Sequence, residues 1–200
     1  MIAYREKEVL RYLGYRRHVE ELDTEAVRAM IKECGEKMNA VVSPKTTYQT
    51  FDCTVEGDTV RVADTVIHSK NLAYNLRGCH KVHMIAGTLG PDIDRLIRRA
   101  ELMNVAEAAV MQALGAEMIE VVIDGLNQKL KAEAEAEGLK LKHRYSPGYG
   151  DCALHHQKDF ERLLGMSREC GITLTDTYLM VPSKSVTALI GICHQGESTQ

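Results

Sequence analysis

The stretch "TTYQTFDCTVEGDTVRVADTVIH", residues 46–68, decides the fold class. It is rich in Thr and Val, alternates in places between apolar and polar residues, and is interrupted by Glu56-Gly57-Asp58. This pattern predicts a β-hairpin followed by more extended chain. Because the early strands come as a hairpin, while later strands and helices are interleaved, we expect an α+β fold. In such a fold a single, largely antiparallel sheet has helices packed on it.

Helical patterns stand on both sides of this stretch. Residues 79–86 predict a buried strand, and Pro91 is well placed as the first residue of the helix that follows. A much longer helical pattern runs from about Asn104 to Glu137. Before the hairpin, four apolar residues at spacings of 4, 3 and 4 form one helical stripe: Val27, Ile31, Cys34 and Met38.

Two helix starts carry a residue type that commonly caps helices. Ser69 precedes "KNLAYNLRG", which predicts a short helix ending at Gly78. Asp151 is expected to cap the helix within "CALHHQKDFERLLG", which ends at Gly165.

The chain of 200 residues suits one domain, and it contains no internal repeat. We expect a single domain over residues 1–200. It would consist of a helical N-terminal arm at 1–45, an α+β core at 46–192 and a flexible tail at 193–200.

Composition excludes several classes of function. A formal charge of -3 argues against a nucleic-acid binder, which normally carries a basic excess. No apolar run approaches the ~20 residues of a membrane span, and the charged start lacks the apolar segment of a signal peptide. We therefore expect a cytoplasmic protein that contacts neither nucleic acid nor membrane. Its six cysteines, none in a CxxC pair, are then expected to be reduced thiols.

The loop "RYSPGYGDC", residues 144–152, contains more than a turn needs. Arg144 has a planar guanidinium suited to binding a carboxylate through two hydrogen bonds. Tyr149 offers an aromatic face and a hydroxyl, and Gly148 lets a ligand approach the backbone closely. The loop therefore suits a small anionic or zwitterionic ligand. The alternative is a structural turn with Arg144 on the surface.

Glu120 is a second candidate, within the apolar stretch "GAEMIEVVID" of the long helix. Burying an unpaired carboxylate is costly, so Glu120 lies either at a solvated edge or at a functional position. Asp124 follows four residues later on the same helix face. Two acids facing a cleft would attract a cationic group of a ligand, and the alternative is an acidic edge facing solvent.

A third candidate is a metal site formed by Cys152, His155 and His156. Cys and His three residues apart at a helix start can share a metal. A fourth ligand would have to come from elsewhere in the chain, so the pattern is weak.

The loop and its surroundings resemble a known family. "RYSPGYGDC" is similar to the Arg-x-x-x-Gly-Tyr-x-x-Cys motif of the activation (reactivation) domain of cobalamin-dependent methionine synthase. A short helix follows the motif, and then a Pro-x-x-Ser-Val stretch, here Pro182 to Val186. Upstream, "MIAGTLGPDIDRLI" resembles the strand-turn-helix that precedes the family's long helix. The resemblance covers roughly residues 70–192.

The resemblance implies a function. Such domains bind S-adenosylmethionine and present it to cobalamin during reductive methylation, with an electron from a flavodoxin-type donor. By the same resemblance, Arg144 would hold the ligand's carboxylate and Glu120 would offset its positive charge. Tyr149 would contact the body of the ligand, Gly148 would leave room for it, and Ser185 would complete the binding residues.

Two features depart from the family pattern. The family's domain begins with an Asp-Trp-x-Pro-Phe-type segment that contributes an aspartate to the ligand, and this chain has no Trp. No cobalamin module is present in the 200 residues. We therefore expect a free-standing version without turnover of its own, acting in trans on methionine synthase or another corrinoid protein. The alternative is a non-catalytic docking or corrinoid-chaperone subunit that has lost S-adenosylmethionine binding.

Overall fold

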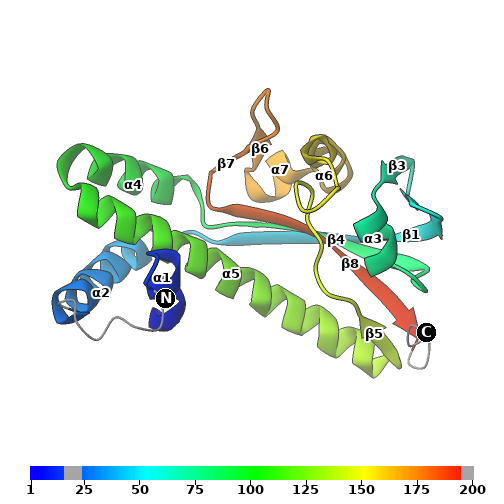
Figure 1. Cartoon of the computed structure of the whole chain (residues 1–200), viewed down its shortest axis with the longest axis horizontal. Helices are drawn as coiled ribbons and strands as arrows, with labels where there is room; N and C mark the ends of the chain where they lie inside the picture. The colour runs from blue at the N-terminus through cyan, green and yellow to red at the C-terminus, as the bar shows by residue number, and fades with distance from the viewer. Residues whose placement is uncertain (16–23, 195–200) are drawn as a thin grey trace.

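The computed structural model describes residues 1–15 and 24–194, which form a three-layered α+β domain (Figure 1). In the described chain, every strand pair of the main sheet is antiparallel. The six strands lie in the order β3-β2-β1-β4-β8-β5. Their bounds are β1 Lys45–Glu56, β2 Thr59–Val62, β3 Thr65–His68, β4 Lys81–Thr88, β5 Leu139–Leu141 and β8 Ser185–His194. A separate small hairpin pairs β6, Thr173–Leu174, with β7, Met180–Val181.

The helices lie on both faces of this sheet. Helix α5, Val105–Ala136, runs across the length of the molecule, with α1, α2 and α4 beside its first half (Figure 1). The bounds of these three are α1 Glu6–Tyr12, α2 Thr24–Val41 and α4 Pro91–Met103. The other face of the sheet is covered by α3 Lys70–Asn75, a 3₁₀ turn at Leu154–His156, α6 Gln157–Leu164 and α7 Met166–Cys170.

The predicted hairpin and fold class are confirmed. Strands β1 and β2 pair with Glu56 opposite Thr59, and β3 continues the meander. Gly57 in the connecting turn has a φ of 58°, a conformation that glycine adopts without a steric penalty. The predicted antiparallel sheet with packed helices is present, and the small β6–β7 hairpin stands beside it as a second sheet.

The two central strands separate two apolar clusters. Ile85 and Ile190 are fully buried against α2, α4 and α5. Met84 and Leu189, their neighbours in sequence, are buried on the opposite face against α3, α6 and α7. This alternation is what a strand buried on both faces requires. The sheet therefore gives α5 a fixed position, and α5 supplies one wall of the site described below.

The segment expected as an N-terminal arm packs into the first of these clusters. Val9 of α1 and Met38 of α2 are completely buried there, together with Leu114 and Met118 of α5. Helices α1 and α2 thus add to the core beside α5 and do not stand apart from it.

The C-terminal boundary also differs from the expectation. Strand β8 continues through His194, which is paired with Leu139, so it extends two residues into the segment expected as a tail. The rest of that segment, 195–200, lies outside the described residues. Of the helices in residues 1–15 and 24–194, none is both long and apolar enough to span a membrane.

Capping confirms one prediction and corrects another. Ser69 caps α3 by accepting a hydrogen bond from the Leu72 N–H at 3.0 Å, as predicted. Asp151 does not cap the helix that follows it. Its carboxylate instead accepts hydrogen bonds from the backbone N–H groups of Lys70 at 2.7 Å and Asn71 at 3.3 Å. The loop 144–152 is therefore attached to the start of a helix distant in sequence.

Candidate functional site

Three carboxylates lie along one face of α5. Glu117, Glu120 and Asp124 follow one another at spacings of three and four residues, which places side chains on the same side of a helix. Glu117 is buried, with a relative exposure of 1%, whereas Glu120 and Asp124 are 35% and 39% exposed. The face therefore passes from the interior of the protein to an open edge.

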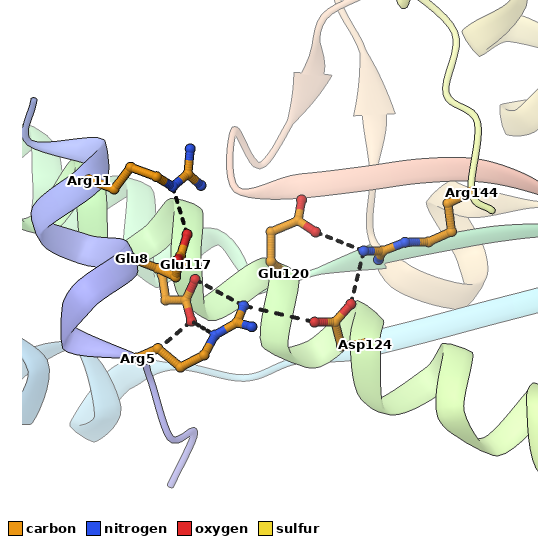
Figure 2. Close-up of polar contacts among 7 residues, drawn as sticks. All are labelled: Arg5, Glu8, Arg11, Glu117, Glu120, Asp124 and Arg144. Carbon is orange, nitrogen blue, oxygen red and sulfur yellow. Dashed lines mark hydrogen bonds and ion pairs between the residues drawn. The ribbon is translucent and has the colours of Figure 1, made fainter. Parts of the chain in front are cut away.

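Arg144 reaches this face from the neighbouring segment of chain. Tyr145 forms an isolated antiparallel bridge with Leu189 of β8, with backbone hydrogen bonds of 2.9 and 2.8 Å. This bridge fixes the backbone beside the sheet edge, and the Arg144 side chain extends toward α5 (Figure 2). Its Nη2 donates to Glu120 Oε2 at 3.0 Å and to Asp124 Oδ1 at 2.9 Å.

The guanidinium of Arg144 is used unequally. Its side chain is 24% exposed, so the two ion pairs are partly shielded from water. One nitrogen, Nη2, donates hydrogen bonds to both carboxylates. The other, Nη1, is buried and has no hydrogen-bond partner among the described residues. A planar guanidinium can donate five hydrogen bonds, so Arg144 retains unused capacity to bind an acceptor.

The turn after Arg144 has a defined shape. Gly148 has a φ of 87° and donates its N–H to the Cys152 carbonyl at 2.7 Å. The Tyr145 hydroxyl donates to the Tyr149 carbonyl at 3.0 Å, and the two rings meet edge to face with centroids 6.2 Å apart. Tyr149 as a whole residue is 74% exposed. Its backbone is thus fixed while its ring stays available for contact.

A cavity of about 400 Å³ lies between this turn, α5 and β8. Its volume falls in the range of ~300–1,000 Å³ that is common for small-molecule sites. Three of the predicted residues line it, namely Glu120, Arg144 and Tyr149, and Gly148 lies in the adjoining turn. Four further residues complete the lining: Tyr145, Ser146, Val186 and Ala188. Tyr145 and Ser146 belong to the motif itself, so the motif contained a signal for them.

Ser185 is not brought to this cavity. It is buried, donates to the Pro182 carbonyl at 2.7 Å, and lies 2.8 Å from Oγ1 of Thr88. Neighbouring residues of a strand point to opposite faces, so Val186 and Ala188 reach the cavity while Ser185 points away. The Ser-Val stretch therefore lines the cavity with Val186, and Ser185 anchors the start of β8.

A larger cavity of about 530 Å³ lies between the β1–β2 turn and α3. Lys70, Tyr74 and Arg77 contribute to its lining, and no residue of the 144–152 loop does. Volume alone does not define a site. Asp58 gives the larger cavity a carboxylate beside its cations and its tyrosine, so the smaller cavity is distinguished by the motif residues that line it, namely Arg144, Tyr145, Ser146 and Tyr149.

The residues of the weak metal pattern have other partners. The ring Nδ1 of His156 forms a hydrogen bond with Asp159 at 2.9 Å. Burial raises the pKa of the Cys152 thiol to about 11, so the thiolate, which is the form that binds metals, is disfavoured. Within the part of the chain that the structure describes, no group of three or more His, Cys, Asp or Glu side chains could hold a metal ion.

Arg5 is a residue of this region that the sequence did not indicate. Its Nε donates to Glu117 Oε1 at 2.7 Å, its Nη2 donates to Glu117 Oε2 at 3.3 Å, and its backbone N–H donates to Oε1 at 3.1 Å. The two residues are 112 positions apart, so no local pattern connects them. The one signal in the sequence is that Glu117 lies in an apolar stretch of helix, where a buried carboxylate requires a cationic or hydrogen-bonding partner.

Comparison with known proteins identifies the family and the fold. The model of the family described as "Vitamin B12 dependent methionine synthase, activation domain" matches residues 81–198. Among solved structures, the chain is similar to the crystal structure of the MetH reactivation domain bound to AdoHcy, with a TM-score of 0.71 and 14% sequence identity. That match covers 100% of this chain and 79% of the other. No curated protein sequence matches this chain. Since the family model covers more than half of its residues, the chain belongs to the family of vitamin B12-dependent methionine synthase activation domains.

Proposed function

We propose that the cavity beside α5 binds S-adenosylmethionine and that the protein presents it to cobalamin carried by a partner. The partner in this proposal is a cobalamin-dependent methionine synthase or another corrinoid protein, on which the chain acts in trans. The observation that carries the proposal is that Arg144, Glu120 and Tyr149 line one cavity in a member of the activation-domain family. The similar MetH domain, whose structure contains AdoHcy, supports the same ligand class.

The charges of the cavity complement this ligand. S-adenosylmethionine carries a carboxylate, an ammonium and a sulfonium, which sum to one positive charge. Arg144 offers a cation for the carboxylate, and Glu120 offers an anion for the positive groups. Asp124 adds a second negative charge beside the cavity. The ring of Tyr149 is available to contact the apolar body of the ligand, as the residue's exposure allows.

The protein's contribution to methyl transfer is positioning. The partner's cobalamin, once reduced by one electron, would supply the nucleophile for the methyl group, and AdoHcy would be the leaving group when the carbon–sulfur bond of S-adenosylmethionine breaks. A sulfonium is already a good leaving group, so no general acid or base is required of this chain. Its residues would orient the ligand and balance its charge. A flavodoxin-type protein is the proposed source of the electron.

A second candidate is a docking or corrinoid-chaperone subunit that does not bind S-adenosylmethionine. One observation favours it: Nη2 of Arg144 already bonds two carboxylates of the same protein. A ligand carboxylate would have to share or displace one of them. A purely structural loop would show the same pairing.

Calorimetric titration with S-adenosylmethionine distinguishes the two candidates. We expect the wild type to bind and Arg144→Ala to bind about ten- to a hundredfold more weakly, which corresponds to roughly 1.5–3 kcal/mol for a charged hydrogen-bonded contact. Arg162→Ala is the matched control, because Arg162 forms an equally short pair with Asp64 outside the cavity. Absence of binding by a folded wild type, or equal losses in both variants, would contradict the proposal.

A further inference from the structure

A second arginine, supplied by the N-terminus of the described chain, lies beside the candidate site. Arg5 directly precedes α1, and its guanidinium lies against the carboxylate face of α5 between Glu117 and Asp124 (Figure 2). It does not line the cavity. Its position therefore raises the question of whether it serves only to hold α1 in place.

The contact with Glu117 fixes where Arg5 lies. Glu117 is almost fully buried, and Arg5 gives it three hydrogen bonds, two from the side chain and one from the backbone. Removing a buried carboxylate's partner is costly, so this contact is held firmly. Hydrogen bonding to Glu117 also raises the pKa of Arg5, which keeps the guanidinium charged at all physiological pH values. Arg5 is thus a fixed cation beside the site.

Asp124 lies between the two arginines. Its Oδ1 accepts a hydrogen bond from Arg144 Nη2 at 2.9 Å, and its Oδ2 lies 3.9 Å from Arg5 Nη2. Glu120, the other carboxylate on Arg144, has no second cationic partner among the described residues. If a ligand carboxylate is to bind Arg144, Asp124 is consequently the acid that can be released at lower cost, because a second cation remains beside it.

We propose that Arg5 is a positioning residue for the ligand site, acting through Asp124. When a carboxylate-bearing ligand engages Arg144, Asp124 shifts its pairing from Arg144 to Arg5, and Glu120 stays at the cavity. Two arginines and three carboxylates are paired here, namely Arg5, Arg144, Glu117, Glu120 and Asp124. Their formal charges sum to -1, which suits a ligand of charge +1. This inference rests on the proposed S-adenosylmethionine binding and adds a residue outside the motif to it.

A double-mutant cycle tests the inference by calorimetric titration with S-adenosylmethionine. We expect Arg5→Ala to weaken binding about two- to fivefold, the range of a solvent-accessible ion pair. In an Asp124→Asn background the same change should have no further effect, because the carboxylate through which Arg5 acts is gone. A merely structural role for Arg5 would weaken binding equally in both backgrounds.

Two additional variants separate binding from folding. Arg5→Ala leaves the buried Glu117 unpaired, so the change is repeated together with Glu117→Gln, which leaves no buried charge. Arg11→Ala is the matched control, because Arg11 lies in α1, the helix that Arg5 precedes, but pairs with Glu8 at 2.7 Å (Figure 2). It should leave affinity unchanged.

The outcomes are distinguishable from failure of the proposed function. No binding by the wild type, or no loss in Arg144→Ala, overturns the proposed function and the role of Arg5 with it. Binding that depends on Arg144 but is unchanged in Arg5→Ala, or is lost equally in the Asp124→Asn background, overturns the Arg5 inference alone.

Discussion

Asp151 and Ser69, 82 residues apart in the chain, cap helix α3 together. The Ser69 hydroxyl donates to the Asp151 carboxylate and accepts the N–H of Leu72. The same carboxylate accepts hydrogen bonds from the first two backbone N–H groups of the helix, those of Lys70 and Asn71. The hydrogen-bond donors at the start of α3 are thus satisfied by a carboxylate of the 144–152 loop. These bonds fix that loop, which includes Tyr149, to the body of the domain.

Asp151→Ala should lower the midpoint of thermal unfolding by about 2–4 °C, the shift expected from losing one helix cap in a domain of this size. Asp151→Asn keeps an oxygen acceptor and should lose less. Circular dichroism melts of the three proteins at neutral pH provide the measurement. Equal melting points for the wild type and Asp151→Ala would show that the cap does not contribute to stability.

The contribution of Asp151 should also depend on pH. The hydrogen bond from Ser69, followed by those from the backbone of Lys70 and Asn71, lowers the pKa of Asp151 in the folded protein. A carboxyl with a lowered folded pKa stabilises above its unfolded value of ~3.9, and this stabilisation is lost as pH falls through the folded pKa. The melting difference between wild type and Asp151→Ala should therefore be constant near neutrality and shrink below about pH 4. A difference that grows on acidification would contradict this assignment.

Gly148→Ala should destabilise the protein by about 1–3 kcal/mol, because a φ of 87° is strained for any residue with a Cβ. The added methyl would also lie 3.0 Å from Leu154 Cδ1. Gly125→Ala is the matched control: it lies in α5, and its added Cβ meets nothing within 4 Å. This control should be neutral or gain up to roughly 1 kcal/mol. Urea unfolding compares the two, and a stable Gly148→Ala would show that the turn adapts.

Cys152 should be unreactive in the folded protein although it belongs to the motif. Burial raises its pKa to about 11, and all six cysteines are buried as free thiols. Labelling with a thiol-reactive chromogenic disulfide should be slow under native conditions and should modify all six thiols after denaturation. Rapid native labelling of Cys152 would indicate an exposed thiolate and reopen a chemical role for it.

The fold was predictable wherever local patterns determine it. The alternation and central Gly in residues 46–68 predicted the hairpin, and the apolar repeat after Asn104 predicted helix α5, which runs over Val105–Ala136. The cap formed by Asp151 could not be assigned in the same way. An aspartate before a helical pattern suits the following helix, and only the tertiary structure shows that α3 lies close enough to receive it.

The site was predictable in part. Arg144, Glu120 and Tyr149 were chosen from residue chemistry and the family resemblance, and they line one cavity. Ser185 was expected there from its position in the motif, but strand alternation turns its hydroxyl toward Thr88, and it does not line the cavity. Arg5 could not be predicted, since its partner Glu117 is 112 residues away and only the packing of α1 on α5 brings them together.

The central claim is most directly tested by methyl transfer in trans. Labelled S-adenosylmethionine, a chemical reductant and this protein are added to a cobalamin-dependent methionine synthase that lacks its own activation domain and carries oxidised cobalamin. We predict transfer of the labelled methyl group to cobalamin with the wild type and a loss with Arg144→Ala, while Arg162→Ala behaves as the wild type. Transfer of equal extent without this protein or with Arg144→Ala, or no transfer at all with a wild type that binds S-adenosylmethionine, would contradict the account.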